Sequence, residues 1–102
     1  MGHRFAVVDK KYLDTFQDTD GVWNLLIAFI RDYCLASDGS ECDYFWVSDD
    51  ESSIEIHRNL TEELINCLEN HNVNYKSKLL PILKTALEKT PMNQAVMLEY
   101  MY

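Results

Sequence analysis

Two short runs rich in β-branched and aromatic residues lie on either side of a four-residue polar turn. The runs are Tyr44–Ser48 and Ser53–His57, and the turn is Asp49–Ser52. This spacing predicts a β-hairpin in which residue 48 pairs with 53, 46 with 55 and 44 with 57. Strand side chains alternate between faces, so one face carries Phe45, Val47, Ile54 and Ile56 and the other carries Tyr44, Trp46, Ser48, Ser53, Glu55 and His57. The first face is apolar and requires a cover from the rest of the chain.

Three stretches carry the apolar spacing of amphipathic helices, and they cover residues 21–36, 59–70 and 76–90. Asp20 precedes the first stretch and is its expected N-cap. Asn59, with Glu62 three residues later, has the pattern of a cap for the second. Pro81 complicates the third, which either begins near Lys78 or is kinked at the proline.

The remaining patterned segments predict strands. Residues 3–8 and 94–102 are rich in β-forming or apolar side chains, whereas residues 10–19 are ambiguous, and one interpretation is a helical turn around Tyr12, Leu13 and Phe16. The resulting order is β-α-β-β-α-α-β. We therefore expect an α+β fold in a single domain, residues 1–102, with about three helices over an antiparallel-rich sheet of about four strands.

The acidic charge is concentrated in one part of the sequence. The chain of 102 residues carries 17 acidic and 9 basic side chains, and its formal net charge is −8. Residues 32–55 hold eight acids and neither lysine nor arginine, whereas residues 64–102 hold three acids and four lysines. This uneven distribution favours a basic protein partner, because local negative charge steers such a partner and accelerates association.

The same charge balance disfavours two other classes of partner. Nucleic acids and anionic membrane surfaces both require a basic footprint on the protein. The longest apolar stretch, residues 22–30, is interrupted by Asn24 and ends at Arg31, so it is too short to span a bilayer. The apolar run of residues 5–8 is too short for a signal peptide. We therefore expect a cytoplasmic protein that contacts neither nucleic acid nor a membrane.

The cysteines and possible metal ligands show no recognisable motif. Cys34, Cys42 and Cys67 are odd in number and lack Cys-x-x-Cys spacing, which argues against a disulfide framework, a zinc site or a redox motif. Asp18–Gly21 imitates part of an EF-hand loop, but Phe16 and Ile27 would occupy its first and last ligand positions. The three histidines, at positions 3, 57 and 71, match no ligand spacing. No metal site is expected.

Catalytic chemistry also has little support. Cys42 lies between Glu41 and Asp43, and adjacent carboxylates disfavour a reactive thiolate. Glu55 and His57 share a strand face and form a possible acid–base pair, although alternate strand residues lie about 7 Å apart. The three glycines are isolated, so no glycine-rich phosphate loop is present. We expect neither enzymatic activity nor a cofactor.

The remaining candidate is a protein-binding surface on the hairpin and the loop before it. Aromatic anchors surrounded by charge are typical of binding hot spots. The candidate partner-binding residues are Asp38, Glu41, Asp43, Tyr44, Trp46, Asp49, Asp50, Glu51, Glu55 and His57. The three adjoining acids of the turn repel one another, and residues 32–55 contain no cation that would relieve this repulsion. A basic partner would supply it.

In size, acidity and lack of a catalytic motif, the chain resembles the bacterial immunity proteins of the contact-dependent growth-inhibition and colicin types. The resemblance is carried by the acidic stretch, residues 32–55. It implies a tight one-to-one complex with a basic nuclease toxin, whose active site or nucleic-acid-binding surface the chain would occlude in the cytoplasm of the producing cell.

Two other classes of function remain open from the sequence. One is a phage or plasmid anti-defence inhibitor or DNA mimic acting on a host nucleic-acid enzyme. Mimics usually spread negative charge over most of their surface, and the slightly basic residues 64–102 depart from that pattern. The other is a small enzyme or regulatory domain that uses His57 and nearby carboxylates.

Overall fold

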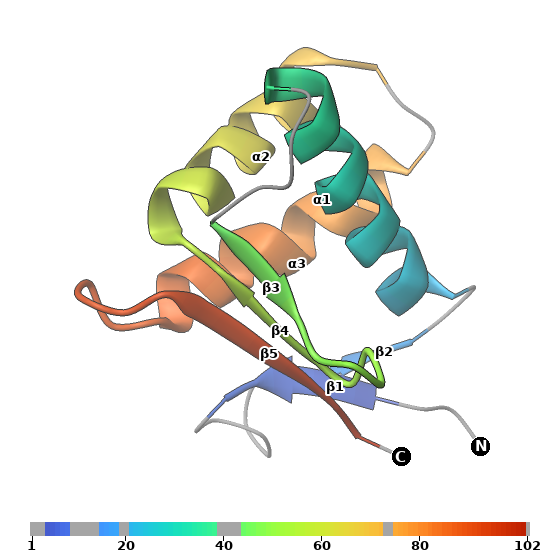
Figure 1. Ribbon diagram of the computed structural model, residues 1–102, viewed down its shortest axis with the longest axis vertical. Coiled ribbons are helices and arrows are strands. Elements are labelled where there is room, and N and C mark those ends of the chain that lie inside the picture. Colours follow the sequence, from blue (N-terminus) through green and yellow to red (C-terminus); the bar gives the residue numbers. More distant parts are fainter. Residues whose placement is uncertain (1–3, 9–14, 19–20, 39–43, 73–74, 102) are drawn as a thin grey trace.

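The computed structural model describes residues 4–8, 15–18, 21–38, 44–72 and 75–101, with only the backbone at residues 15 and 36–38 (Figure 1). Within these residues the chain forms an α+β fold of three helices and five strands. The elements are β1 (Arg4–Val7), β2 (Thr15–Gln17), α1 (Val22–Asp38), β3 (Phe45–Val47), β4 (Ser53–Ile56), α2 (Arg58–Asn70), α3 (Lys76–Lys89) and β5 (Val96–Met101). The α+β class and the three helices expected from the sequence are confirmed.

The strands form one sheet in the order β2-β1-β5-β4-β3, and every neighbouring pair is antiparallel. The predicted hairpin register is confirmed, because Trp46 lies opposite Glu55. The Ser48 N–H donates to the Ser53 carbonyl at 3.0 Å, and the His57 N–H donates to the Tyr44 carbonyl at 2.8 Å. The alternation in the sequence therefore placed each hairpin side chain on the correct face.

The sheet has five strands where the sequence predicted about four. The additional strand is β2, in the segment whose sequence pattern was ambiguous, and Phe16 belongs to it rather than to a helical turn. Phe16 lies opposite Phe5 of β1, and the two rings stack with their centroids 5.2 Å apart. Three residues are too few to show a two-residue period, so this strand depends on its partner rather than on its own pattern. Tyr12 and Leu13 lie outside the described residues.

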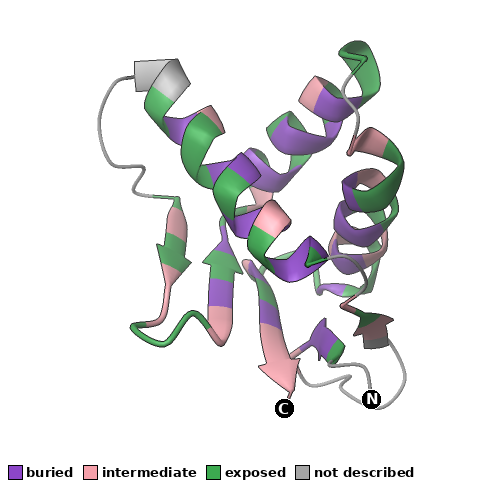
Figure 2. Ribbon diagram, turned by 90° about the vertical axis from the view of Figure 1, so that its right-hand side faces the viewer, coloured by how far each residue is buried: buried purple, intermediate pink, exposed green. Residues whose placement is uncertain are grey.

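All three helices lie on one side of the sheet (Figures 1 and 2). Burial alternates along β4 and over the first three residues of β5, so that one face of each is enclosed, whereas Phe5, Ala6 and Val7 of β1 are all buried (Figure 2). The strand side chains turned toward the helices are Phe5, Val7, Ile54, Ile56, Val96 and Leu98, all buried in one core with the helices. That core leaves the opposite face of the sheet without a helical cover among the described residues.

The helices begin within one residue of the predicted ranges, and the structure shows how the first two are capped. The Trp23 backbone N–H donates to Asp18 Oδ1 at 2.9 Å, so Asp18 caps α1, whereas the expected cap, Asp20, lies outside the described residues. Gly21 just before the helix has a φ of 70°, which glycine adopts without strain. The N-cap of α2 is His57, whose Nδ1 accepts from the Asn59 N–H at 3.3 Å. The prediction of Asn59 as the cap was wrong, because the chain is already helical at Arg58.

Pro81 lies inside α3, the sixth residue of a helix that begins at Lys76. The predicted range of residues 76–90 is confirmed to within one residue, and the alternative start near Lys78 was wrong. A kink at Pro81 stays a prediction. Proline has no N–H, so the hydrogen bond that residue 81 would donate to the Ser77 carbonyl is missing. The buried side chains of Leu79, Ile82 and Leu83 hold this part of the helix against the core instead.

Candidate protein-binding surface

The uncovered face of the sheet carries two exposed aromatic side chains. Tyr44 is 58% exposed and Trp46 is 56% exposed, and both lie on the face opposite the helices. Around them lie Glu55, directly opposite Trp46, and Met97 on the next strand, which is 40% exposed. The His57 ring packs against the Tyr44 ring with centroids 5.1 Å apart. We call these five residues the outer patch.

A small hollow lies within the outer patch. It has a volume of about 70 Å³ and is lined by Tyr44, Phe45, Trp46, Glu55, His57 and Ala95. Small-molecule sites usually enclose at least about 300 Å³, so this hollow is too small for a substrate or cofactor. It is of a size to receive the end of one side chain from another protein.

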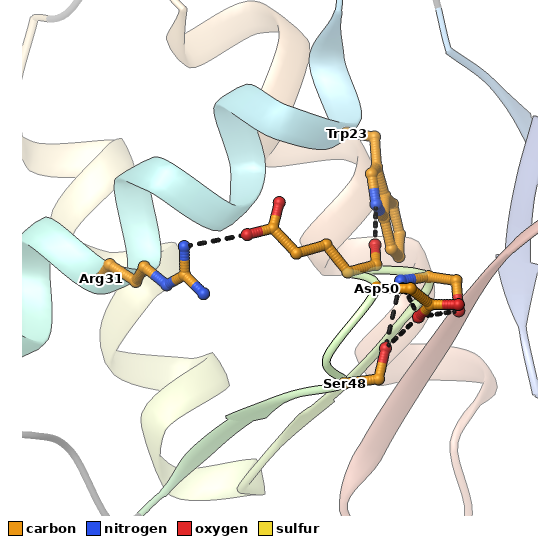
Figure 3. Close-up of polar contacts among 6 residues, drawn as sticks. Trp23, Arg31, Ser48 and Asp50 are labelled. Carbon is orange, nitrogen blue, oxygen red and sulfur yellow. Dashed lines mark hydrogen bonds and ion pairs between the residues drawn. The ribbon is translucent and has the colours of Figure 1, made fainter.

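The acidic turn after β3 does not extend the outer patch but folds toward α1. The Trp23 indole Nε1 donates to the Glu51 carbonyl at 2.8 Å, and Arg31 Nη1 contacts Glu51 Oε2 at 3.3 Å (Figure 3). Glu51 has a φ of 58°, a left-handed conformation that is uncommon for a residue with a side chain. The indole and guanidinium contacts fix the turn in this conformation.

The Asp50 carboxylate accepts hydrogen bonds from donors within the turn itself. Its Oδ1 accepts from the Ser52 hydroxyl at 2.6 Å, from the Ser48 hydroxyl at 2.9 Å and from the Ser52 N–H at 3.1 Å (Figure 3). These hydrogen bonds, led by that from the Ser52 hydroxyl, lower the pKa of the Asp50 carboxyl below its usual value.

The expectation that the turn lacks internal compensation is therefore corrected. Arg31 precedes the stretch without cations by one residue, and helix α1 brings it to Glu51. Asp50 is held by serine donors. Of the three acids in the turn, Asp49 is exposed and has no interaction described. Reversing the charge of Asp50 or Glu51 would disturb the structure of the turn. Charge reversal at Asp49 is therefore the substitution that tests the charge of the turn by itself.

The ten predicted site residues consequently divide into three groups. Tyr44, Trp46, Glu55 and His57 gather in the outer patch. Asp49, Asp50 and Glu51 form the turn at the end of the hairpin, of which Glu51 faces α1. Asp38 is the last residue of α1, with its side chain not described, and Glu41 and Asp43 lie outside the described residues.

Sequence reasoning missed a second hollow, of about 210 Å³, lined by Asp18, Trp23, Asn24, Asp50, Glu51 and Tyr100. Here the Tyr100 hydroxyl donates to Asp18 Oδ2 at 2.7 Å, and the Tyr100 and Trp23 rings lie 5.3 Å apart. Asp18 and Tyr100 are 82 residues apart, so no local pattern signals their contact. Asp18 serves the fold at both oxygens, as a helix cap and as the acceptor for Tyr100.

The histidine and cysteine side chains are the groups that could carry catalytic or metal-binding chemistry. His57 Nδ1 is engaged as the α2 cap, and none of the hydrogen bonds described joins His57 to Glu55. Cys34 is buried. Cys67 Sγ on α2 lies 3.8 Å from Nδ1 of His71, the residue that follows the helix, and that nitrogen lies 2.8 Å from the Cys67 carbonyl oxygen. Among the residues placed in the structure, no three or more His, Cys, Asp or Glu side chains are grouped to hold a metal ion.

Comparisons of the chain with protein-family models, with curated proteins and with solved structures find no match. No helix in the described ranges has the length and apolar character to cross a membrane.

Proposed function

We propose that this chain is an inhibitory binding protein that docks a basic protein through the outer patch, and that the partner is a nuclease toxin neutralised by the complex. The observation that carries the proposal is the exposure of Tyr44 and Trp46 side by side on an uncovered sheet face. Large aromatic side chains at the centre of an interface contribute a large share of binding energy. More than half of each side chain is open to a partner.

The charge around the outer patch supports a basic partner. Strands β3 and β4 contain no lysine or arginine, and Glu55 is exposed beside Trp46. The exposed Asp49 adds a further negative charge at the end of the hairpin. An acidic rim around apolar anchors speeds association with a cationic surface and repels an anionic one. A carboxylate-bearing surface is also suited to occupy a cleft that otherwise binds phosphates.

The test is capture of the partner from the source organism with the full chain, followed by affinity measurements on the purified pair. The captured protein is expected to be basic, to bind one-to-one and to associate more slowly as salt is raised. Replacement of either anchor, Tyr44→Ala or Trp46→Ala, is expected to weaken binding by about thirtyfold, and the joint replacement by up to about a thousandfold, since each anchor truncation at a hot spot removes about 2 kcal/mol.

Two matched variants serve as controls. Met92→Ala truncates a side chain that is 81% exposed outside the outer patch and is expected to leave affinity unchanged. Glu55→Lys is compared with Glu88→Lys on α3, which changes the net charge equally. An equal loss of affinity in the two lysine variants would contradict the proposal. Unchanged affinity in the variant without the Tyr44 and Trp46 side chains would contradict it as well.

The inhibitory part of the proposal has its own readout. The partner alone is expected to cleave nucleic acid and to lose this activity in the complex. A captured partner that is a host DNA-binding enzyme without toxicity would instead assign the chain to the anti-defence inhibitors.

A further inference from the structure

Strand β3 is one border of the described sheet, and its backbone groups face alternately toward β4 and away from it. The hydrogen bonds between Ser48 and Ser53 and between His57 and Tyr44 show which residues of this strand face β4. In an antiparallel pair every second residue bonds to the neighbouring strand. Residues 44, 46 and 48 therefore bond to β4, whereas the N–H and C=O groups of Phe45 and Val47 point away from the sheet.

No hydrogen bond to these outward groups is described. The strand order places no described strand beyond β3. An open row of donors and acceptors is a template for a strand from another chain. Charged residues or proline usually protect such a border, and β3, with the sequence Phe-Trp-Val, has neither.

The side chains beside this border are apolar on the inner side. Phe45 and Val47 face inward and are only half-buried. Arg31 of α1 reaches the turn after β3, so the face of α1 that carries Arg31 lies toward the hairpin. Leu35 follows Arg31 by four residues and therefore shares that face, where it is 55% exposed. A strand added beside β3 would cover all three apolar side chains.

On the outer side, the border favours a cation. The position opposite Trp46 on an added strand lies about 4.8 Å away, and Glu55 lies one strand further in the other direction. A lysine or arginine at that position would lie over the indole ring, which attracts cations, and would extend toward the Glu55 carboxylate. No basic side chain of β3 or β4 would oppose it.

We propose that the partner binds by adding an extended segment to β3, with alternating basic and apolar side chains. The Phe45 and Val47 backbone groups pair with it, its apolar side chains cover Leu35, and its basic side chains lie over Trp46. This mode of binding rests on the proposed function and names the chemistry of the segment that the outer patch receives. It adds a sixth strand to the described sheet.

The test uses the full chain and a blocked heptapeptide of alternating lysine and valine, with alternating glutamate and valine as the control peptide. At saturation by the lysine peptide, the Phe45 and Val47 amide hydrogens are expected to exchange about tenfold more slowly, whereas the outer-face neighbours Glu55 and Met97 keep their rates. The glutamate peptide is expected not to bind, because it meets the acidic surface with like charge.

A pair of variants isolates the backbone contribution. Val47→Pro and Val47→Ala both remove the branched side chain, but only proline removes the outward N–H, which β4 does not use. Proline is tolerated at such a border position. We expect Val47→Pro to bind the lysine peptide about tenfold more weakly than Val47→Ala. The amide-exchange measurement on the unchanged chain decides the matter if the proline variant does not fold.

The outcomes separate this inference from the function on which it rests. Binding without slower exchange at Phe45 and Val47, or no binding of the lysine peptide up to about 1 mM, would overturn strand addition. In either case the captured partner would still test the outer patch through Tyr44 and Trp46. The proposed function itself would be contradicted in the capture experiment, if the captured partner bound the Tyr44→Ala, Trp46→Ala variant with unchanged affinity.

Discussion

The two tryptophans allow the same substitution to be made in opposite environments. Trp23 is 3% exposed and donates its indole N–H to the Glu51 carbonyl at 2.8 Å. Its ring packs against Phe5 with a centroid distance of 4.9 Å. Trp46 is 56% exposed on the opposite face of the sheet. Phenylalanine at either position removes the N–H and shrinks the ring by the same number of atoms.

The expected cost at Trp23 has two parts of similar size. Loss of the hydrogen bond to Glu51 removes about 1 kcal/mol of stability. The smaller ring leaves a void of about 40 Å³, which at about 24 cal/mol per Å³ costs another 1 kcal/mol or so. Trp23→Phe should therefore lower the free energy of unfolding by about 2 kcal/mol. Trp46→Phe should change it by less than about 0.5 kcal/mol, because neither part applies at an exposed site.

Urea unfolding followed by far-UV circular dichroism is the suitable assay, because tryptophan fluorescence changes with the substitutions themselves. At an m value of about 2 kcal/mol/M, Trp23→Phe should lower the midpoint by about 1 M and leave m unchanged. Equal midpoints for the two variants would refute the reasoning, because they would mean that the indole of Trp23 neither fills the core nor holds the turn.

Three further predictions follow from the turn and the helices. Arg31→Ala should cost less than about 1 kcal/mol and the effect should shrink in high salt, because its contact with Glu51 is about half exposed. Asp50→Asn should destabilise the protein at neutral pH. The depressed pKa of Asp50 gives stability that is present above its unfolded value of 3.8, so the difference from the parent chain should disappear as the pH falls through the lower folded pKa in acid titrations of unfolding. Pro81→Ala should raise the free energy of unfolding by about 2 kcal/mol in thermal or urea melts, because regaining the bond to Ser77 outweighs the smaller gain in unfolded-chain entropy.

The hairpin could be predicted in detail because its information is local. Alternation over Tyr44–Ser48 and Ser53–His57, together with the turn length, leaves one register that buries Ile54 and Ile56. The helices could be predicted equally well, since apolar residues such as Leu26 and Ile30 recur at the spacing of one buried helix face. Local patterns were sufficient wherever one element alone determines which face is buried.

The rest depended on contacts between residues far apart in the chain. Strand β2 exists through Phe5 and has no pattern of its own. The sequence showed no cation paired with the acidic turn, because Arg31 lies 20 residues before Glu51 and only the fold brings the two together. His57 caps α2 through a ring nitrogen, a role that its predicted place at the end of a strand concealed. In each case the deciding partner comes from another element.

The position of β5 has a consequence for how the protein forms during synthesis. It is the last described strand along the chain, yet it lies at the centre of the sheet between β1 and β4. Before β5 leaves the ribosome, the earlier strands can form only two separate hairpins, β1 with β2 and β3 with β4. Isolated two-stranded hairpins are marginal in water. Leu98, which pairs with both Val7 and Ile54, then joins the two hairpins, so the described sheet closes around β5.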